Sequence, residues 1–187
     1  KKSFFQCLTA NRHLSQAHRF AYSEMKKQNR QSQVGVSHNI VYFTRPASFI
    51  NRFIWNYFFI RSIRDCQDFI GVNYYHSDRD AVEHSEFLNW PIDPVGFYAV
   101  LKEMAVYKKP IYITEANPQL ADSQTAGQEF TAFARAAIAT GKVSGLAWLQ
   151  YADSVEYPNI GLVTAALKIK PAYLAYKNLI AEYRSVK

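Results

Sequence analysis

The amino-acid sequence predicts an α/β protein in which a helix precedes about four βα units that form half of a (β/α)₈ barrel. Short strand-like segments alternate with helix-like segments, and the strands carry apolar residues on both faces, which is typical of a parallel sheet covered by helices. Four such units are half of the eight in a barrel. A doubly wound open sheet is the alternative, but it usually carries a G-x-G-x-x-G turn, and this sequence has none.

The first half of the chain contains two predicted helices and two predicted strands. Residues 3–28 are predicted to be helical. Apolar residues recur there at three- and four-residue steps, namely Leu8, Leu14, Ala17, Ala21 and Met25. Residues 33–38 are short, β-branched and strand-like, and 68–75 are a second strand. Between these strands, residues 48–63 form a helix that is apolar over most of its circumference.

The second half of the chain continues the alternation. Asp93 is predicted to cap a helix that has Pro94 at its first position and that runs to about residue 107. The remaining elements are a strand at 111–114, a helix at 125–140 that Gly141 ends, a strand at 143–150 and a helix at 171–183. Residues 1–187 are expected to be one domain fragment, and this length is ample for a hydrophobic core.

Composition argues against several classes of partner. The net charge is +7, but the one dense basic run, at residues 26–30, ends a predicted helix, where cations suit the helix dipole, so no nucleic acid is expected. The apolar stretch Phe49–Ile63 contains polar residues and is too short to span a bilayer, so no membrane is expected. Cys7 and Cys66 imply no disulfide framework and no metal site, which favours a reducing, cytoplasmic compartment.

The carboxyl ends of the strands are where a barrel of this kind builds its active site. Alternation along the second strand places Asn73 and Tyr75 on the same side. By the same rule, Glu115 is expected to share a side with Ile111 and Ile113. A carboxylate at the end of an apolar strand is costly to bury without a partner. Taken alone, Glu115 is explained equally well by an ordinary role, as a solvated strand-end acid or a helix cap, and by a functional one.

Several motifs resemble, in order and spacing, those of glycoside hydrolase family 1, the β-glucosidase family. Residues 68–75, DFIGVNYY, are similar to the family's D-F-[IL]-G-[LI]-N-Y-Y strand, and residues 110–117, PIYITEAN, to its P-I-Y-I-T-E-N-G strand. Further similarities lie in residues 90–97 (WPIDPVGF), 145–148 (GLAW, compared with the family's G-[YF]-x-x-W), 161–163 (GLV), 170–171 (KP) and 17–22 (AHRFAY). The resemblance covers nearly the whole chain and implies the C-terminal, second half of a TIM barrel.

The resemblance implies a role for each site residue of a retaining β-glycosidase. Glu115 matches the nucleophile, Tyr75 the tyrosine that hydrogen-bonds this carboxylate, and Asn73 the asparagine near the sugar 2-hydroxyl and the catalytic pair. Trp148 matches the indole that forms the floor of the first sugar subsite. Glu156 and Tyr157 fall roughly where the family binds distal hydroxyls, with Tyr157 in place of a tryptophan. No cofactor and no metal ion are expected.

The acid/base glutamate of the family is absent, because no N-E-P motif occurs in the chain. The first-strand Gln and His-Trp that bind sugar are absent too, Ala116 replaces an Asn, and the segment from Trp148 to Asp153 is one residue longer than the pattern. The expected partners are therefore a β-glycoside or oligosaccharide substrate and an N-terminal half-barrel that supplies the acid. The alternative is a non-catalytic half-barrel that self-associates or acts as a carbohydrate-binding or scaffold module.

Other polar groups have simpler explanations. Loop residues Glu83, His84 and Glu86 could ligate a metal ion, but they lack the spacing of a complete site, and a solvated loop is expected. His38 and His76 lie at strand ends and could line the cleft, although an ordinary hydrogen-bonded histidine is the commoner case.

Overall fold

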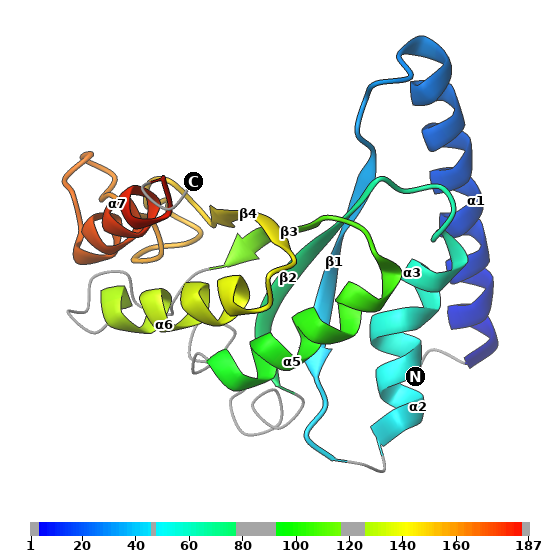
Figure 1. Ribbon diagram of the computed structural model, residues 1–187, viewed down its shortest axis with the longest axis horizontal. Helices are drawn as coiled ribbons and strands as arrows, with labels where there is room; N and C mark the ends of the chain where they lie inside the picture. Colours follow the sequence, from blue (N-terminus) through cyan, green and yellow to red (C-terminus); the bar gives the residue numbers. More distant parts are fainter. Residues whose placement is uncertain (1–3, 46–47, 78–92, 117–125, 185–187) are drawn as a thin grey trace.

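In the computed structural model, four parallel strands form one sheet in the order β1-β2-β3-β4. The structure describes residues 4–45, 48–77, 93–116 and 126–184. The strands are β1 (Gly35–Tyr42), β2 (Phe69–Ser77), β3 (Ile111–Ala116) and β4 (Val143–Trp148). Each strand lies beside the next one in the sequence, as in a barrel, and a helical segment connects each pair (Figure 1). The predicted half-barrel is confirmed.

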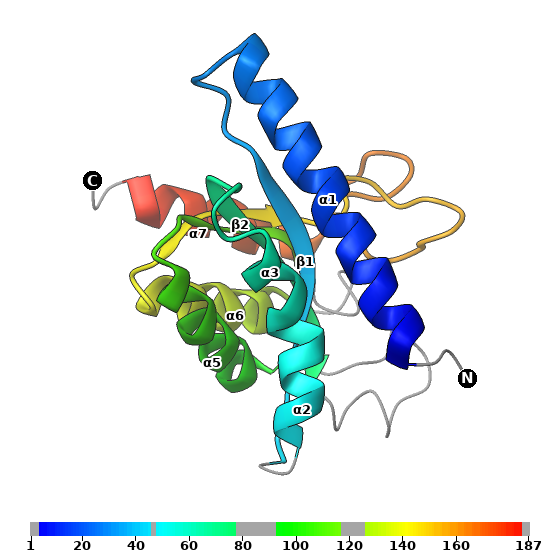
Figure 2. The ribbon, with the colours of Figure 1, turned by 90° about the vertical axis from the view of Figure 1, so that its right-hand side faces the viewer.

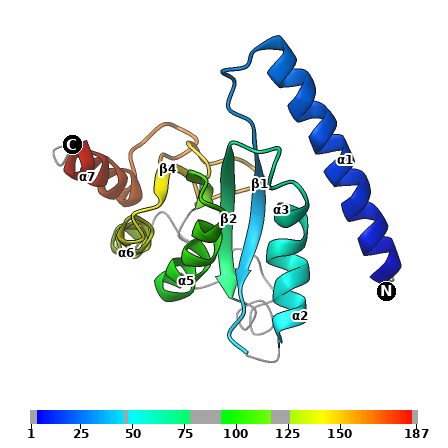
Figure 3. The same cartoon turned by 45° about the vertical axis from the view of Figure 1, so that its right-hand side comes forward.

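Helices follow one another around one side of this sheet, from α1 at one end to α7 at the other (Figures 1 and 3). They are α1 (Phe4–Gln28), α2 (Phe49–Arg52), the π-helix η2 (Phe53–Tyr57), α3 (Phe58–Ser62), α5 (Pro94–Met104), the 3₁₀-helix η4 (Ala105–Tyr107), α6 (Ala126–Ala139) and α7 (Pro171–Arg184). Asp93 caps α5 as predicted, since its side chain accepts a hydrogen bond of 2.8 Å from the Gly96 amide. No helix within these described ranges is both long and apolar enough to cross a membrane.

The core lies between the sheet and helices α5 and α6. Its strand side consists of fully buried or nearly fully buried residues, namely Ile70, Val72, Tyr74, Ile111 and Ile113. Its helix side includes Phe97 of α5 and Phe133 of α6, whose rings stack with their centroids 3.7 Å apart. These strand residues alternate along β2 and β3, so the residues between them face the other side of the sheet, which we call the inner face.

Two predicted elements differ from the structure in extent. The first strand begins at Gly35 and runs on to Tyr42, and the backbone of Val41 near its end is hydrogen-bonded to Asn56 of the following helical segment. The predicted helix at 48–63 is interrupted by η2, in which Asn56 is fully buried. Asn56 Nδ2 donates to the Val41 carbonyl at 2.8 Å, and Asn56 Oδ1 accepts from the Val41 amide at 3.1 Å. The Asn56 side chain thus provides hydrogen-bond partners for the Val41 amide and carbonyl near the end of β1.

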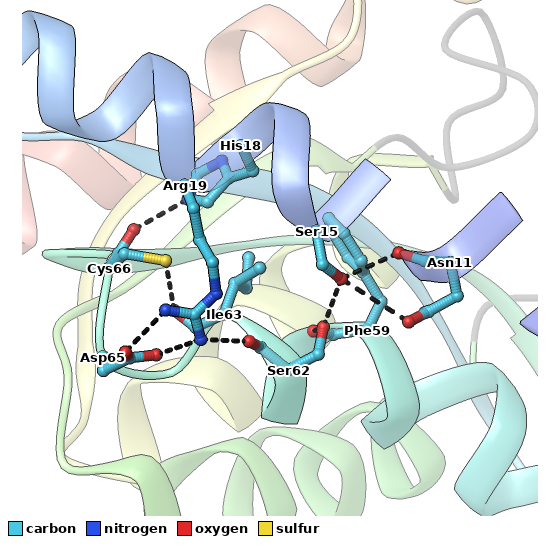
Figure 4. Close-up of polar contacts among 9 residues, drawn as sticks. All are labelled: Asn11, Ser15, His18, Arg19, Phe59, Ser62, Ile63, Asp65 and Cys66. Atoms are coloured by element: carbon cyan, nitrogen blue, oxygen red, sulfur yellow. Dashed lines mark hydrogen bonds and ion pairs between the residues drawn. The ribbon is translucent and has the colours of Figure 1, made fainter. Parts of the chain in front are cut away.

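Helix α1 is attached to the rest of the molecule by polar contacts (Figure 4). Ser15 Oγ lies 2.5 Å from Ser62 Oγ, and a ring nitrogen of His18 lies 2.8 Å from the Cys66 carbonyl. Arg19 binds both carboxylate oxygens of Asp65, at 2.5 and 2.6 Å. The helix therefore faces α3 and the turn after it with its hydrophilic side.

The apolar stripe that predicts this helix remains uncovered. Leu14 is 60% exposed and Met25 is 47% exposed, and Ala17 and Ala21 between them are exposed too. Figure 2 looks at the molecule from the side of α1 and shows no described element in front of that helix. Apolar side chains in such a row usually pack against another element. The described part of the chain does not contain one.

The buried Asn56 yields a prediction about stability. Replacing Asn56 with Ala leaves the Val41 amide and carbonyl without partners in a dry site, which should lower the free energy of unfolding by about 3 kcal/mol. Urea unfolding followed by circular dichroism measures this change. Asn178→Ala, on the exposed side of α7, is the control and should cost nothing. Equal unfolding midpoints for the two variants would show that the Asn56 bonds contribute no stability.

Candidate active site

The carboxyl ends of β2 and β3 bring together three of the predicted site residues. Asn73 pairs with Glu115 across the two strands, and Tyr75 follows on the same side of β2 as Asn73. The Tyr75 hydroxyl donates a hydrogen bond to the Glu115 carboxylate. Asn73, Tyr75 and Glu115 are all partly buried. Strand facing along β2 is as alternation predicted, because Tyr74 between them is 3% exposed and lies in the core.

The Tyr75 phenol keeps its proton in this arrangement. Burial raises its pKa above the ordinary value, and the hydrogen bond and the negative charge of Glu115 raise it further. Tyr75 is therefore a hydrogen-bond donor to the carboxylate and not a base. A carboxylate held by such a donor at the open end of a sheet can act as a nucleophile or as an electrostatic stabiliser.

The expected facing of Glu115 was wrong, and the reason is a break in the strand register. Val72 pairs with Ile113, but the next residue, Asn73, pairs with Glu115, so β3 has one extra residue, Thr114, at this point. A bulge of this kind turns the following side chain to the other face. Glu115 thus lies on the inner face with Asn73, and not with Ile111 and Ile113 in the core.

Trp148 is not brought to this pair of residues. Its ring packs on Phe130 of α6, with centroids 4.5 Å apart, and on Tyr176 of α7, and its Nε1 donates to the Ile160 carbonyl at 2.9 Å. Trp148 therefore lies among the helices outside the sheet. The family motif G-[YF]-x-x-W has its Trp four residues after the Gly, whereas Trp148 is three residues after Gly145. A difference of one residue places a strand side chain on the opposite face.

The segment after β4 contains the two remaining predicted residues. Tyr157 is exposed, and it contributes to the raised pKa of Tyr75 by a smaller effect than burial and Glu115. Glu156 is exposed on the same segment. The base of the segment is held by Asp153, which binds the buried Lys170 ammonium at 2.7 Å and accepts from the Gly161 amide at 2.9 Å. Asp153 thus has a structural role.

Of the two strand-end histidines, His38 lies away from the site, and the side chain of His76 is not among the described residues. His38 faces the helices, where a ring nitrogen lies 2.8 Å from the Trp55 carbonyl, and burial lowers the pKa of His38. The side chain of His76 and the loop with Glu83, His84 and Glu86 lie outside the described residues. Within residues 4–45, 48–77, 93–116 and 126–184, no three metal-ligating side chains gather in a way that could hold an ion.

Sequence reasoning missed two hydroxyl groups on the inner face. Ser37 Oγ and Thr114 Oγ1 donate to Asn73 Oδ1 at 2.7 and 2.6 Å, and the two hydroxyl oxygens lie 2.8 Å apart. Ser37 stands beside Gly71 in the register of β1 and β2. The signal was present in the strand ends that contain Ser37 and Thr114, but neither residue type suggests chemistry by itself.

Comparison with solved structures identifies the fold. No family model matches the chain, and no curated protein matches it. Among solved structures, Fpglu1 from Fervidobacterium pennivoraus is 22% identical with a TM-score of 0.77, and the alignment covers 96% of this chain and 50% of that one. The hyperthermophilic β-glucosidase from Pyrococcus furiosus is 21% identical with a TM-score of 0.78, covering 96% and 48%.

The β-glycosidase from Thermosphaera aggregans gives a similar result, with 22% identity, a TM-score of 0.74, and coverage of 95% of this chain and 49% of that one. The chain thus spans about half the length of the structures that it matches. The resemblance found in the motifs is confirmed at the level of the fold. This chain has the fold of half of a β-glycosidase barrel.

Proposed function

We propose that this chain supplies the nucleophile half of the active site of a retaining β-glycosidase. The observation that carries the proposal is the hydrogen bond from Tyr75 to Glu115 at the carboxyl edge of a half-barrel that has the fold of β-glycosidases. Barrels of this kind build their active sites at that edge. The bulge at Thr114 supports the proposal, because it brings the carboxylate to the inner face.

In the proposed reaction, a Glu115 carboxylate oxygen attacks the anomeric carbon of a β-glycoside. The bond from that carbon to the leaving oxygen breaks, and the oxygen takes a proton from a second carboxylic acid about 5–5.5 Å from the first. The resulting glycosyl ester is then hydrolysed by water, whose proton goes to the second carboxylate. Tyr75 donates a hydrogen bond to Glu115 and so holds the carboxylate in place at the end of the strand.

The sugar-binding part of the proposal rests on residues near this pair. Asn73 lies beside Glu115 and is assigned to a sugar hydroxyl, and Glu156 and Tyr157 to hydroxyls farther along the substrate. The proposal does not use Trp148, whose ring packs between α6 and α7.

The second carboxylic acid must come from another half-barrel. Three features support such a partner: the coverage of only half of each matched β-glycosidase, the outer strands β1 and β4 with one free edge each, and the uncovered stripe of α1. A strand laid beside β1 would let α1 pack as the other helices pack, with its apolar residues on the sheet. A partner with four strands would complete the barrel.

Self-association is the rival explanation of the open edges. If a second copy closed the barrel, its β4 would lie beside β1. The helix after β4, which is α7, and the helix before β1, which is α1, would then both need the position over that junction. This conflict favours a complementary half in which no helix follows the last strand.

The role of Glu115 can be tested in the complete barrel. Glu115→Gln should abolish turnover of 4-nitrophenyl β-glucoside, with a loss of many orders of magnitude if the residue forms the covalent intermediate. Initial rates, with the fold checked by circular dichroism, give the answer. Glu129→Gln, at an exposed position of α6, serves as the matched control and should retain full activity. A Glu115→Gln variant that keeps a tenth of the wild-type rate would remove this residue from the mechanism.

The two neighbouring tyrosines should respond differently. Tyr75→Phe removes the donor to Glu115 and should weaken catalysis far more than Tyr74→Phe, because the Tyr74 ring lies in the core and faces away from the site. Values of kcat/KM for both variants on 4-nitrophenyl β-glucoside measure this difference. Equal losses in the two variants would contradict the assignment of Tyr75.

The isolated chain should have no glycosidase activity. One carboxylate cannot attack the anomeric carbon and protonate the leaving group in the same step. Activity should appear when a chain carrying the first four strands of the barrel is added. The assay is hydrolysis of the same aryl glucoside with and without that chain, alongside the mass of each sample in solution. Rapid hydrolysis by the pure 187-residue chain would mean that its own acids complete the site, and a stable, inactive dimer would favour the scaffold alternative.

A further inference from the structure

Three polar side chains from three neighbouring strands form a closed group on the inner face. Ser37 of β1 and Thr114 of β3 each lie within hydrogen-bond distance of Asn73 Oδ1 of β2, at 2.7 and 2.6 Å, and of each other, at 2.8 Å. We call Ser37, Asn73 and Thr114 the hydroxyl–amide group. It adjoins the proposed nucleophile, since Thr114 directly precedes Glu115 and Asn73 pairs with it.

Two features of the sequence make this group possible. A Cβ atom at Gly71 would lie 2.9 Å from the Cα of Ser37 and 3.1 Å from the Cγ2 of Thr114, so the absence of a side chain at Gly71 lets the two residues approach. Thr114 follows Ile113 of the core, so alternation turns its hydroxyl inward, and the bulge at Thr114 brings Glu115 to the same face. Alternation therefore sets the hydroxyl, and the bulge sets the carboxylate.

The contacts with Ser37 and Thr114 determine which end of the Asn73 carboxamide faces these two hydroxyls. A carboxamide has an acceptor end and a donor end, and a half-turn about its last bond exchanges them. Ser37 Oγ and Thr114 Oγ1 each have one proton to donate, and both donate it to Asn73 Oδ1, which can accept two hydrogen bonds. With Oδ1 engaged by both hydroxyls, the Nδ2 group is left as the end of the side chain that can donate to a ligand.

We infer that Ser37 and Thr114 are positioning residues, which hold the Asn73 carboxamide so that its N–H groups donate to one hydroxyl oxygen of the bound sugar. This inference rests on the proposed glycosidase function. The two hydroxyls touch no reacting atom, and they act through Asn73. Their effect is therefore confined to the sugar hydroxyl that Asn73 binds. A general role in folding would instead affect every substrate alike.

The test uses the complete barrel, 4-nitrophenyl β-glucoside and its monodeoxy analogues. Asn73→Ala first identifies the hydroxyl concerned, because the analogue that lacks it is the one whose kcat/KM this substitution leaves unchanged. Ser37→Ala and Thr114→Val should then each lower kcat/KM for the parent glucoside by about tenfold, the scale of one hydrogen bond, and by less than about twofold for that analogue. Ser144→Ala, at an exposed site near the start of β4, is the control and should change neither value.

Each result decides between roles. A loss on the parent glucoside that disappears with the identified analogue supports positioning. Equal losses on all analogues would mean that the hydroxyls only hold the strand ends, and unchanged kinetics would mean that Asn73 is oriented without them, so either result overturns the inference. A wild-type barrel that hydrolyses none of the glycosides would refute the proposed function itself, which separates that failure from the others.

Discussion

The burial of one face of the sheet against α5 and α6 is the constraint on which the candidate site depends. Ile70 and Val72 of β2 and Ile111 and Ile113 of β3 are almost completely buried there. A slip of one residue in either strand would move these side chains to the opposite face and expose them. Because the buried face of the sheet does not tolerate a change of register, the residues between these apolar positions are fixed on the inner face. Polar chemistry at the strand ends is positioned by apolar packing behind it.

The elements of the fold could be predicted because they depend on local periodicity, whereas parts of the site could not. The facing of Tyr75 followed from alternation within one strand. The facing of Glu115 did not, because the bulge at Thr114 is a property of the pairing of β2 with β3. Trp148 was misplaced because a side chain that is one residue out of phase lies on the other face of the strand. The stripe of α1 indicated a helix, but periodicity does not say what covers it.

The proposed two-carboxylate reaction would give half a barrel a distinct role. In such a reaction the nucleophile and the acid stand on opposite sides of one bond, so strands on different sides of a barrel can supply them. This chain concentrates on one side: a carboxylate, the phenol of Tyr75 that binds it, and an amide held by two hydroxyls. All of these contacts lie within three adjacent strands of this chain, so the geometry around Glu115 is set by the chain itself.

The attachment of α1 has a consequence for the response of the molecule to salt. Besides the uncharged contacts of Ser15 and His18, this helix is held by two ion pairs, the exposed pair of Arg19 with Asp65 and the half-buried pair of Lys26 with Asp68. Counter-ions screen such pairs, and at 1 M ionic strength the Debye length is only about 3 Å. The core between the sheet and α5 and α6 contains no such charges among its residues and is strengthened by many salts. Rising ionic strength should therefore loosen the helix at the open edge of the sheet while the core behind the strand ends stays intact.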